Sequence, residues 1–256
     1  MSFWEHLDEL RKVIFRSALS VLILMVFVFL NKSFVFDTVI FAPASSDFIL
    51  YDWFRSLANL LAMPGLAPDP FKIELINIEL SAQFFIHISV SFTIAIILSL
   101  PYIFYQIWLF IKPALYDNER IAARKAFMFA SVLFFIGALV GYFFVFPLTV
   151  RFLGTYQVAS WVVNKISLQS YISTFTWMII IMGVVFEMPA LAALLSRIGI
   201  LGKKTLKRYR KHAFVVLIII AAIITPSGDA FTLFIVGMPM YILYEFSILV
   251  CRDLDK

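Results

Sequence analysis

Residues 80–111 read LSAQFFIHISVSFTIAIILSLPYIFYQIWLFI and contain no lysine, arginine, aspartate or glutamate. A helix needs about 20 consecutive apolar residues to cross the roughly 30 Å hydrocarbon core of a bilayer, and this stretch exceeds that length. Pro101 lies within it, and because proline removes a backbone hydrogen bond we expect a bend or a break there. The stretch therefore predicts a membrane-spanning helix.

The composition of the whole chain points the same way. Of its 256 residues 62% are hydrophobic and 14% are charged, and its mean hydropathy is +0.96. Soluble domains are typically about 45–50% apolar and about 25% charged, so a soluble fold would leave far too much apolar surface in water. The composition excludes an ordinary soluble enzyme and a disordered chain. The single cysteine, Cys251, excludes an internal disulfide and a cysteine-based zinc site.

Six apolar segments qualify as membrane crossings or come close. They cover residues 13–30, 80–111, 126–150, 166–195, 213–225 and 230–250. The fifth has about 13–16 apolar residues, which is short for a crossing at about 1.5 Å of helix per residue. We therefore predict an all-α integral membrane protein, a single domain over residues 1–256 with six transmembrane helices, the last two short. The outer loop 31–79 is long, and the apolar spacing around Trp53 predicts a short amphipathic helix at the outer surface.

The positive charges predict the orientation. Six crossings put both termini on one side, and cytoplasmic loops carry an excess of lysine and arginine. Sixteen of the 21 lysines and arginines fall on the side of the termini, namely Arg11, Lys12, Arg16, Lys112, Arg120, Arg124, Lys125, Arg197, Lys203, Lys204, Lys207, Arg208, Arg210, Lys211, Arg252 and Lys256. We expect both termini in the cytoplasm, and we assign the basic excess to topology and to anionic lipid head groups, not to nucleic acid.

Glu187 is the sharpest polar anomaly, because it lies in an otherwise apolar run of the fourth crossing. A charge at the centre of a membrane helix costs about 2.5–3.5 kcal/mol on insertion scales, so such a residue is a functional candidate by default. A structural hydrogen bond to another helix is the competing interpretation. The residues alone leave both interpretations open.

Carboxylates also stand on the basic side of the chain. Glu5, Asp8 and Glu9 precede the first crossing, and Asp8 is spaced for an ion pair with Lys12 four residues later. Glu119 lies in the opening turn of the helix that follows Pro113 and the second crossing. The helix dipole alone would favour a carboxylate at that position, so Glu119 has a structural interpretation as well.

The sequence contains no pattern that is typical of covalent catalysis. The chain has no glycine-rich phosphate loop and no serine nucleophile elbow, and its three histidines, His6, His87 and His212, are too scattered for a metal site. We therefore expect no catalytic residues, no metal, no cofactor and no enzymatic activity.

Several motifs together resemble one known family. They are HLDEL at 6–10, YQIWLFIKPALYDNER at 105–120, VFPL at 145–148, FEMP at 186–189, TP at 225–226 and PMY at 239–241. With them the chain resembles the TatC family, the multi-pass core subunit of the twin-arginine, or Sec-independent, protein translocase. The resemblance covers nearly the whole chain.

The resemblance implies that the chain binds the twin-arginine signal peptides of folded cargo proteins. In the family two glutamates bind the arginine pair, and the matching positions are Glu9 and Glu119. Carboxylates and guanidinium groups form strong bidentate pairs, and lysine lacks the planar fork, so a two-lysine peptide should bind worse. The resemblance also places four further residues on this surface: Leu10, Arg11, Phe110 and Tyr116.

The resemblance further implies partners and a location. Glu187 becomes a contact for single-span TatA- or TatB-type subunits, and Pro43 and Asp229 match functional positions of the outer loops. The protein would form homo-oligomers within its complex in the bacterial cytoplasmic (inner) membrane and export cargo using the proton gradient. The chain departs from the family in a longer first outer loop and in reading Thr-Pro-Ser-Gly-Asp at 225–229.

A carrier of small solutes is the alternative function. A proton-coupled secondary transporter could use Glu187 as its proton site. Such carriers usually have internal repeats and a binding site on broken helices at the membrane midplane. We find no internal repeat in the sequence, which favours the protein-transport interpretation.

Overall fold

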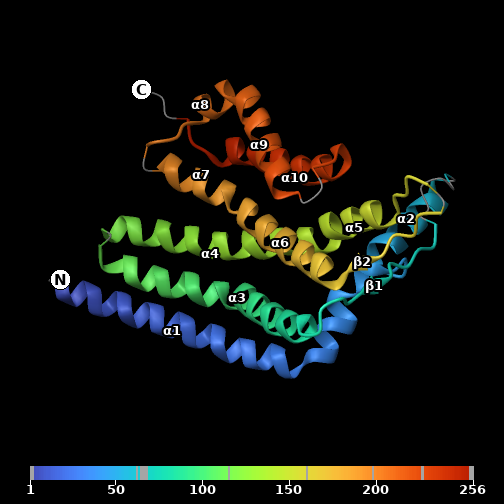
Figure 1. The fold of residues 1–256 in the computed structure, drawn as a ribbon. Helices are drawn as coiled ribbons and strands as arrows, with labels where there is room; N and C mark the ends of the chain where they lie inside the picture. The colour runs from blue at the N-terminus through green and yellow to red at the C-terminus, as the bar shows by residue number, and fades with distance from the viewer. Residues whose placement is uncertain are drawn as a thin grey trace.

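The computed structural model describes residues 3–61, 63, 69–114, 116–159, 161–197, 199–225 and 228–253, without the side chains of residues 3, 117–119, 121 and 122. The described chain is mostly helical (Figure 1). Its elements are α1 (Phe3–Leu30), the π-helix η1 (Phe34–Ile40), the 3-10 helix η2 (Ala42–Ala44), α2 (Ile49–Leu60), β1 (Leu75–Ile76), α3 (Ala82–Ile111), the 3-10 helix η4 (Lys112–Ala114), α4 (Asp117–Val140), the π-helix η5 (Gly141–Val145), α5 (Phe146–Thr155), β2 (Ile166–Ser167), α6 (Leu168–Phe186), α7 (Met188–Arg197), α8 (Lys203–Arg208), α9 (Arg210–Ile224) and α10 (Ala230–Val250).

Five helical segments of the described chain are long and apolar enough to cross a membrane. They are Trp4–Leu30, Ala82–Ala114, Ala123–Thr155, Leu168–Arg197 and Ala230–Val250. These five match five of the six predicted crossings, which confirms a mostly helical membrane protein. The remaining prediction, 213–225, coincides with α9, whose 15 residues make a helix of only about 22 Å. The sixth crossing and the orientation of the termini therefore stay predictions.

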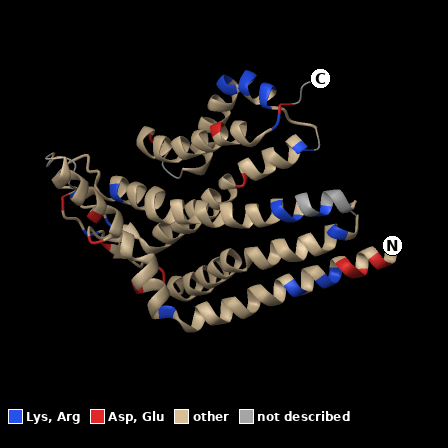
Figure 2. Ribbon diagram, turned by 180° about the vertical axis from the view of Figure 1, so that it is seen from behind, with Lys and Arg blue, Asp and Glu red and all other residues tan. Residues whose placement is uncertain are grey.

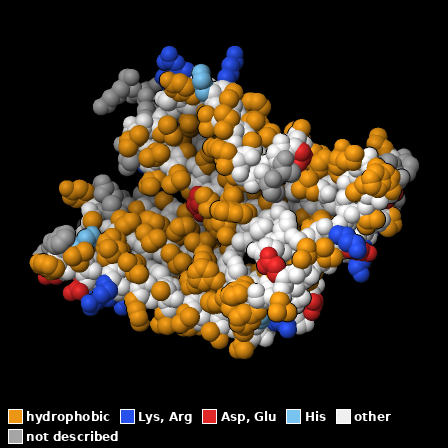
Figure 3. Space-filling model, viewed as in Figure 1, with side chains coloured by type: hydrophobic (Ala, Val, Ile, Leu, Met, Phe, Trp, Pro, Cys, Tyr) orange, Lys and Arg blue, Asp and Glu red, His pale blue; other side chains and the backbone are white. Residues whose placement is uncertain are grey.

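The helices are arranged as a layered bundle with two distinct ends (Figure 1). α1 packs against α3, α3 against α4, α4 against α6, and α10 against both α7 and α9. The chain begins at the same end as the turn from α3 to α4 and the end of α7, whereas α2, β1, β2 and α5 form a cap at the other end. Only 6% of the apolar window of α1 is buried inside the chain, so its outer surface is suited to lipid. Apolar side chains spread over the broad face seen in Figure 3.

Glycines allow close packing of α4 and η5 against α6. A Cβ atom at Gly137 would stand 2.5 Å from the backbone oxygen of Met182, and one at Gly183 would stand 2.5 Å from the ring of Phe134. Small residues let helix backbones approach in a bilayer, where association depends on packing and not on release of water. Gly137 and Gly141 are four residues apart, the spacing of a familiar helix-packing motif, so the sequence carried a signal for this contact.

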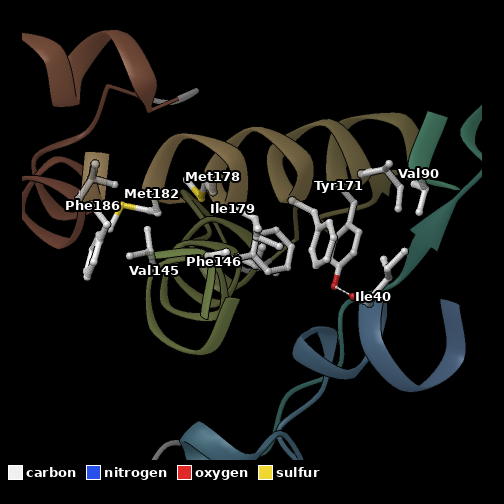
Figure 4. Close-up of a cluster of buried hydrophobic side chains, with 14 of the residues drawn as sticks. Ile40, Val90, Val145, Phe146, Tyr171, Met178, Ile179, Met182 and Phe186 are labelled. Atoms are coloured by element: carbon white, nitrogen blue, oxygen red, sulfur yellow. Dashed lines mark hydrogen bonds between the residues drawn. The ribbon is translucent and has the colours of Figure 1, made fainter. Parts of the chain in front are cut away.

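Three tyrosines fasten the outer cap to the bundle. The hydroxyl groups of Tyr171 and Tyr142 donate to the backbone oxygens of Ile40 and Val39 at 2.7 and 2.9 Å, and Tyr51 donates to Pro147 at 2.8 Å. Figure 4 shows the Tyr171 bond at one end of the buried cluster. Burial raises the pKa of Tyr51, so its hydroxyl keeps the proton that it donates.

Two short strands complete the cap and qualify the all-α prediction. β1 and β2 pair in parallel, with Leu75 opposite Ile166, and so join the first outer loop to the second. The predicted start of the fourth crossing at 166 was wrong by two residues, because β2 occupies Ile166 and Ser167 and α6 begins at Leu168. The predicted short amphipathic helix is confirmed as α2, which buries three residues, Leu50, Tyr51 and Ala58, whereas its place on the outer side stays a prediction.

Two prolines act differently from one another. α3 continues through Pro101, so the expected break is absent. The fourth crossing is divided at Glu187, where α6 ends and α7 begins, and Pro189 lies in the first turn of α7. Proline is tolerated in a first turn because its missing N–H needs no partner there, which explains why the division falls just before it.

Replacing Gly137 with alanine should weaken the bundle. The new Cβ would meet backbone, which cannot move aside as a side chain can, and overpacking typically costs about 1–3 kcal/mol. We expect a lower melting temperature for Gly137→Ala in detergent, measured by loss of the monodisperse size-exclusion peak after heating. Gly237→Ala is the control, because its Cβ would meet side chains and not backbone, the tip of Ile218 at 3.3 Å and the Cβ of Ala221 at 3.9 Å. Equal melting temperatures for Gly137→Ala and the unaltered chain would contradict the packing argument.

Candidate functional site

The predicted peptide-binding residues come from three helix ends that lie together. Glu9, Leu10 and Arg11 are in α1, Phe110 is in the last turn of α3, and Tyr116 directly precedes α4. The ring of His6 stacks on that of Phe110 at 4.4 Å between centroids, which brings the start of α1 against the end of α3. We call this region the α1–α3–α4 end.

The ion pairs at the start of α1 differ from the predicted one. Lys12 donates to Glu9 at 2.7 Å, and Arg11 lies 3.6 Å from Asp8, so both pairs are three residues apart and the predicted pair of Asp8 with Lys12 was wrong. Glu9 precedes the apolar part of α1. Its hydrogen bond from Lys12, and then the charge of Lys12, lower the pKa of the Glu9 carboxyl. Glu9 is therefore an ionised carboxylate that is only partly covered.

The other predicted residues around Glu9 are accessible. The exposed fractions of Leu10 and Tyr116 are 37% and 78%. The backbone oxygen of Tyr116 accepts from the N–H of Arg120 at 3.0 Å, which fixes the entry into α4. Glu119 lies in the first turn of α4, and its side chain falls outside the described residues. The backbone thus places Glu119 at the same end of the bundle as Glu9.

Glu187 stands at the break between α6 and α7. It is half-buried, and its Oε1 atom is buried without a hydrogen-bond partner in the described part of the chain. Glu245 contrasts with it, since its carboxylate accepts from Arg210 at 2.6 Å and from the Tyr241 hydroxyl at 3.2 Å. Within the described residues the structure therefore gives Glu187 Oε1 no bond of the kind that would make the side chain a purely structural one.

The two outer-loop candidates have clear local roles. Pro43 is buried in η2 at the base of the cap. Asp229 caps the N-terminus of α10, where one carboxylate oxygen accepts from the backbone N–H groups of Phe231 and Thr232 at 3.0 and 2.8 Å. The cap explains an aspartate at this position without any contact outside the chain. Among the described residues, no three His, Cys, Asp or Glu side chains are grouped to hold a metal ion.

Known proteins resemble this chain in sequence and in fold. A family model described as Sec-independent protein translocase protein (TatC) matches residues 5–239. The TatC of Blattabacterium sp. subsp. Periplaneta americana (strain BPLAN) is 39% identical over 258 residues, covering 100% of this chain and 97% of that protein. The chain belongs to the TatC family. The TatC of Campylobacter jejuni is 32% identical, covering 98% of this chain and 93% of its own length. A crystal structure of the twin-arginine translocase receptor TatC matches with a TM-score of 0.71 and 30% identity, covering 96% of this chain and 99% of that one.

Membership of the TatC family settles the class of function. The chain is a component of a Sec-independent protein translocase and an integral membrane protein. The alternative of a proton-coupled carrier of small solutes is not supported, because the family match and the relatives above are all translocase proteins.

Replacing Glu187 with an apolar residue of similar length should stabilise the isolated chain. A buried polar atom without a partner costs about 1–3 kcal/mol, so we expect Glu187→Met to raise the melting temperature in detergent. Glu245→Gln is the control: its carboxylate is already paired with Arg210 at 2.6 Å, so removing that charge should give no rise in melting temperature. A lower melting temperature for Glu187→Met would show that the carboxyl group has a structural partner within the chain.

Proposed function

We propose that the chain is the receptor that binds twin-arginine signal peptides at the α1–α3–α4 end. The observation that carries the proposal is the Glu9 carboxylate, which is ionised, partly exposed and paired with Lys12 three residues away. An exposed ion pair contributes little to stability. An arginine of a peptide can therefore replace Lys12 at little cost to the fold.

The chemistry of this exchange favours arginine. A guanidinium group donates two parallel N–H bonds to one carboxylate, whereas the ammonium group of lysine donates as a point charge. Glu119, placed by its backbone at the same end, would receive the second arginine of the pair. Phe110 and Leu10 would cover the aliphatic parts of the peptide, with Arg11 and Tyr116 at the margin. Two carboxylates on different helices would then select two adjacent arginines.

We further propose six crossings over residues 1–256, with both termini in the cytoplasm of a bacterium. In support, lysines and arginines gather at the end of the bundle where both termini lie (Figure 2). α9 would be the short crossing, beginning at Arg210 and Lys211 and ending before Asp229. The peptide site at the α1–α3–α4 end would then face cytoplasmic cargo.

The proposed role as a translocase receptor also implies partner subunits. The unpaired Oε1 of Glu187 would accept from a polar group on a single-span TatA- or TatB-type helix. Several copies of the chain would assemble with these subunits in the inner membrane and export folded cargo using the proton gradient. Pro43 and Asp229 would shape the outer surface of that assembly.

Capture of a signal peptide tests the receptor proposal. We expect the detergent-purified chain to retain a twin-arginine peptide in a pull-down and to retain its two-lysine variant roughly tenfold less. Glu9→Ala and Glu119→Ala should each reduce capture of the arginine peptide, and the double variant should abolish it. Asp8→Ala is the matched control, a carboxylate beside Glu9 that should leave capture unchanged. Normal capture by the double variant would refute the site.

Accessibility of introduced cysteines tests the six crossings. In a Cys251→Ser background, we expect Ser227→Cys to react with a membrane-impermeant maleimide on intact cells stripped of their outer membrane. Glu5→Cys and Asp253→Cys should react only after the membrane is opened. Reaction of positions 5 and 253 from opposite sides would mean that α9 does not cross.

A further inference from the structure

A groove between α3 and α4 lies beside the α1–α3–α4 end but is lined by other residues. Its volume is about 480 Å³, and α3, η4 and α4 supply its walls. Of the residues assigned to peptide binding, the five with described side chains, Glu9, Leu10, Arg11, Phe110 and Tyr116, are not among those lining it.

The groove changes from basic to apolar along both of its helices. On α4, Arg120 and Arg124 are one turn apart, and Phe127 follows on the same face one turn later. On the α3 side, Lys112 follows Trp108 by one turn. Because α3 and α4 are joined directly by the turn after Lys112, their cations lie at one end of the groove and their apolar residues lie deeper in the bundle.

At the basic end of the groove, the cations of Lys112 and Arg124 are available to a ligand. Lys112 and Arg124 have no ion-pair partner within the residues that the structure describes, and both side chains are exposed. The described lining includes no aspartate or glutamate. Lys112 and Arg124 therefore present two cations to an anion.

The deeper part of the groove is open toward the lipid-facing surface. Trp108 is only 7% exposed and forms its floor with Phe127, the two rings being 6.2 Å apart. At the rim, Tyr105 and Met128 are 54% and 61% exposed. An acyl chain could therefore enter from the bilayer without displacing a helix.

We propose that this groove binds one anionic glycerophospholipid of the surrounding leaflet. Its phosphate lies between Lys112 and Arg124, and one acyl chain runs along Phe127 and Met128 over the floor made by Trp108. Basic pockets between membrane helices on the cytoplasmic side recognise lipid head groups in this way. The bound lipid fixes the turn from η4 to α4, which carries Tyr116. The inference does not depend on the peptide site.

Quenching of Trp108 fluorescence tests the proposal. The full chain is reconstituted in vesicles of phosphatidylcholine that contain a small fraction of acyl-brominated phosphatidylglycerol or, for comparison, acyl-brominated phosphatidylcholine. The signal of Trp108 is the difference between the chain and Trp108→Phe. We expect stronger quenching by the brominated phosphatidylglycerol, and a loss of that preference in Lys112→Gln/Arg124→Gln, roughly fivefold in apparent affinity for each cation removed.

A matched double variant tests whether the lipid preference comes from this groove or from general attraction between a basic chain and anionic lipid. Lys203→Gln/Lys207→Gln removes the same charge from α8, which carries basic residues and does not line the groove. It should keep the preference for phosphatidylglycerol. An equal loss in both double variants, or equal quenching by the two lipids in the unaltered chain, would overturn the proposal. So would quenching of Trp108 by a bromine-labelled signal peptide in place of the lipid.

Discussion

The close approach of α4 to α6 is the contact on which the rest of the structure depends. In a bilayer no water is displaced when helices meet, so association needs backbones that come near enough for dense packing. Gly137, Gly141 and Gly183 provide that distance. α3 then packs on α4, and α7 and α10 follow from α6. The residues that we propose for peptide binding at the α1–α3–α4 end are therefore positioned by a contact in the middle of the bundle.

The two ends of the molecule are held by different kinds of interaction. At the outer cap, Tyr51, Tyr142 and Tyr171 make buried bonds between segments far apart in the chain. At the opposite end, Glu9 and Lys12 pair within one turn and remain exposed. A buried hydrogen bond between distant segments is not readily replaced by a bond to another molecule. An exposed ion pair within one helical turn is. The end proposed to take up a peptide is the one whose contacts can be replaced without unfolding a helix.

The sequence predicted the helical crossings well because apolar length is a local property. α10 matched its predicted range, whereas α1 and α4 begin about ten residues before the predicted crossings because polar residues extend both helices. Contacts between distant segments were not predictable in this way. The pairing of β1 with β2 depends on a contact between two loops that are far apart in the sequence. No local sequence pattern predicts such a contact. The partner in a local ion pair was equally unpredictable. Lys12 is spaced to reach either Asp8 or Glu9, and in the structure it pairs with Glu9.

The tyrosine bonds of the cap also set an order of events during synthesis. The carbonyl group of Ile40 receives its hydrogen bond from Tyr171, which is 131 residues later in the chain. At about 5–20 residues per second, that partner leaves the ribosome roughly 7–26 seconds after Ile40 does. The last of the three tyrosine bonds of the cap can therefore form only after the first turn of α6 has been made, so residues 39–40 wait for a partner that follows two complete long helices.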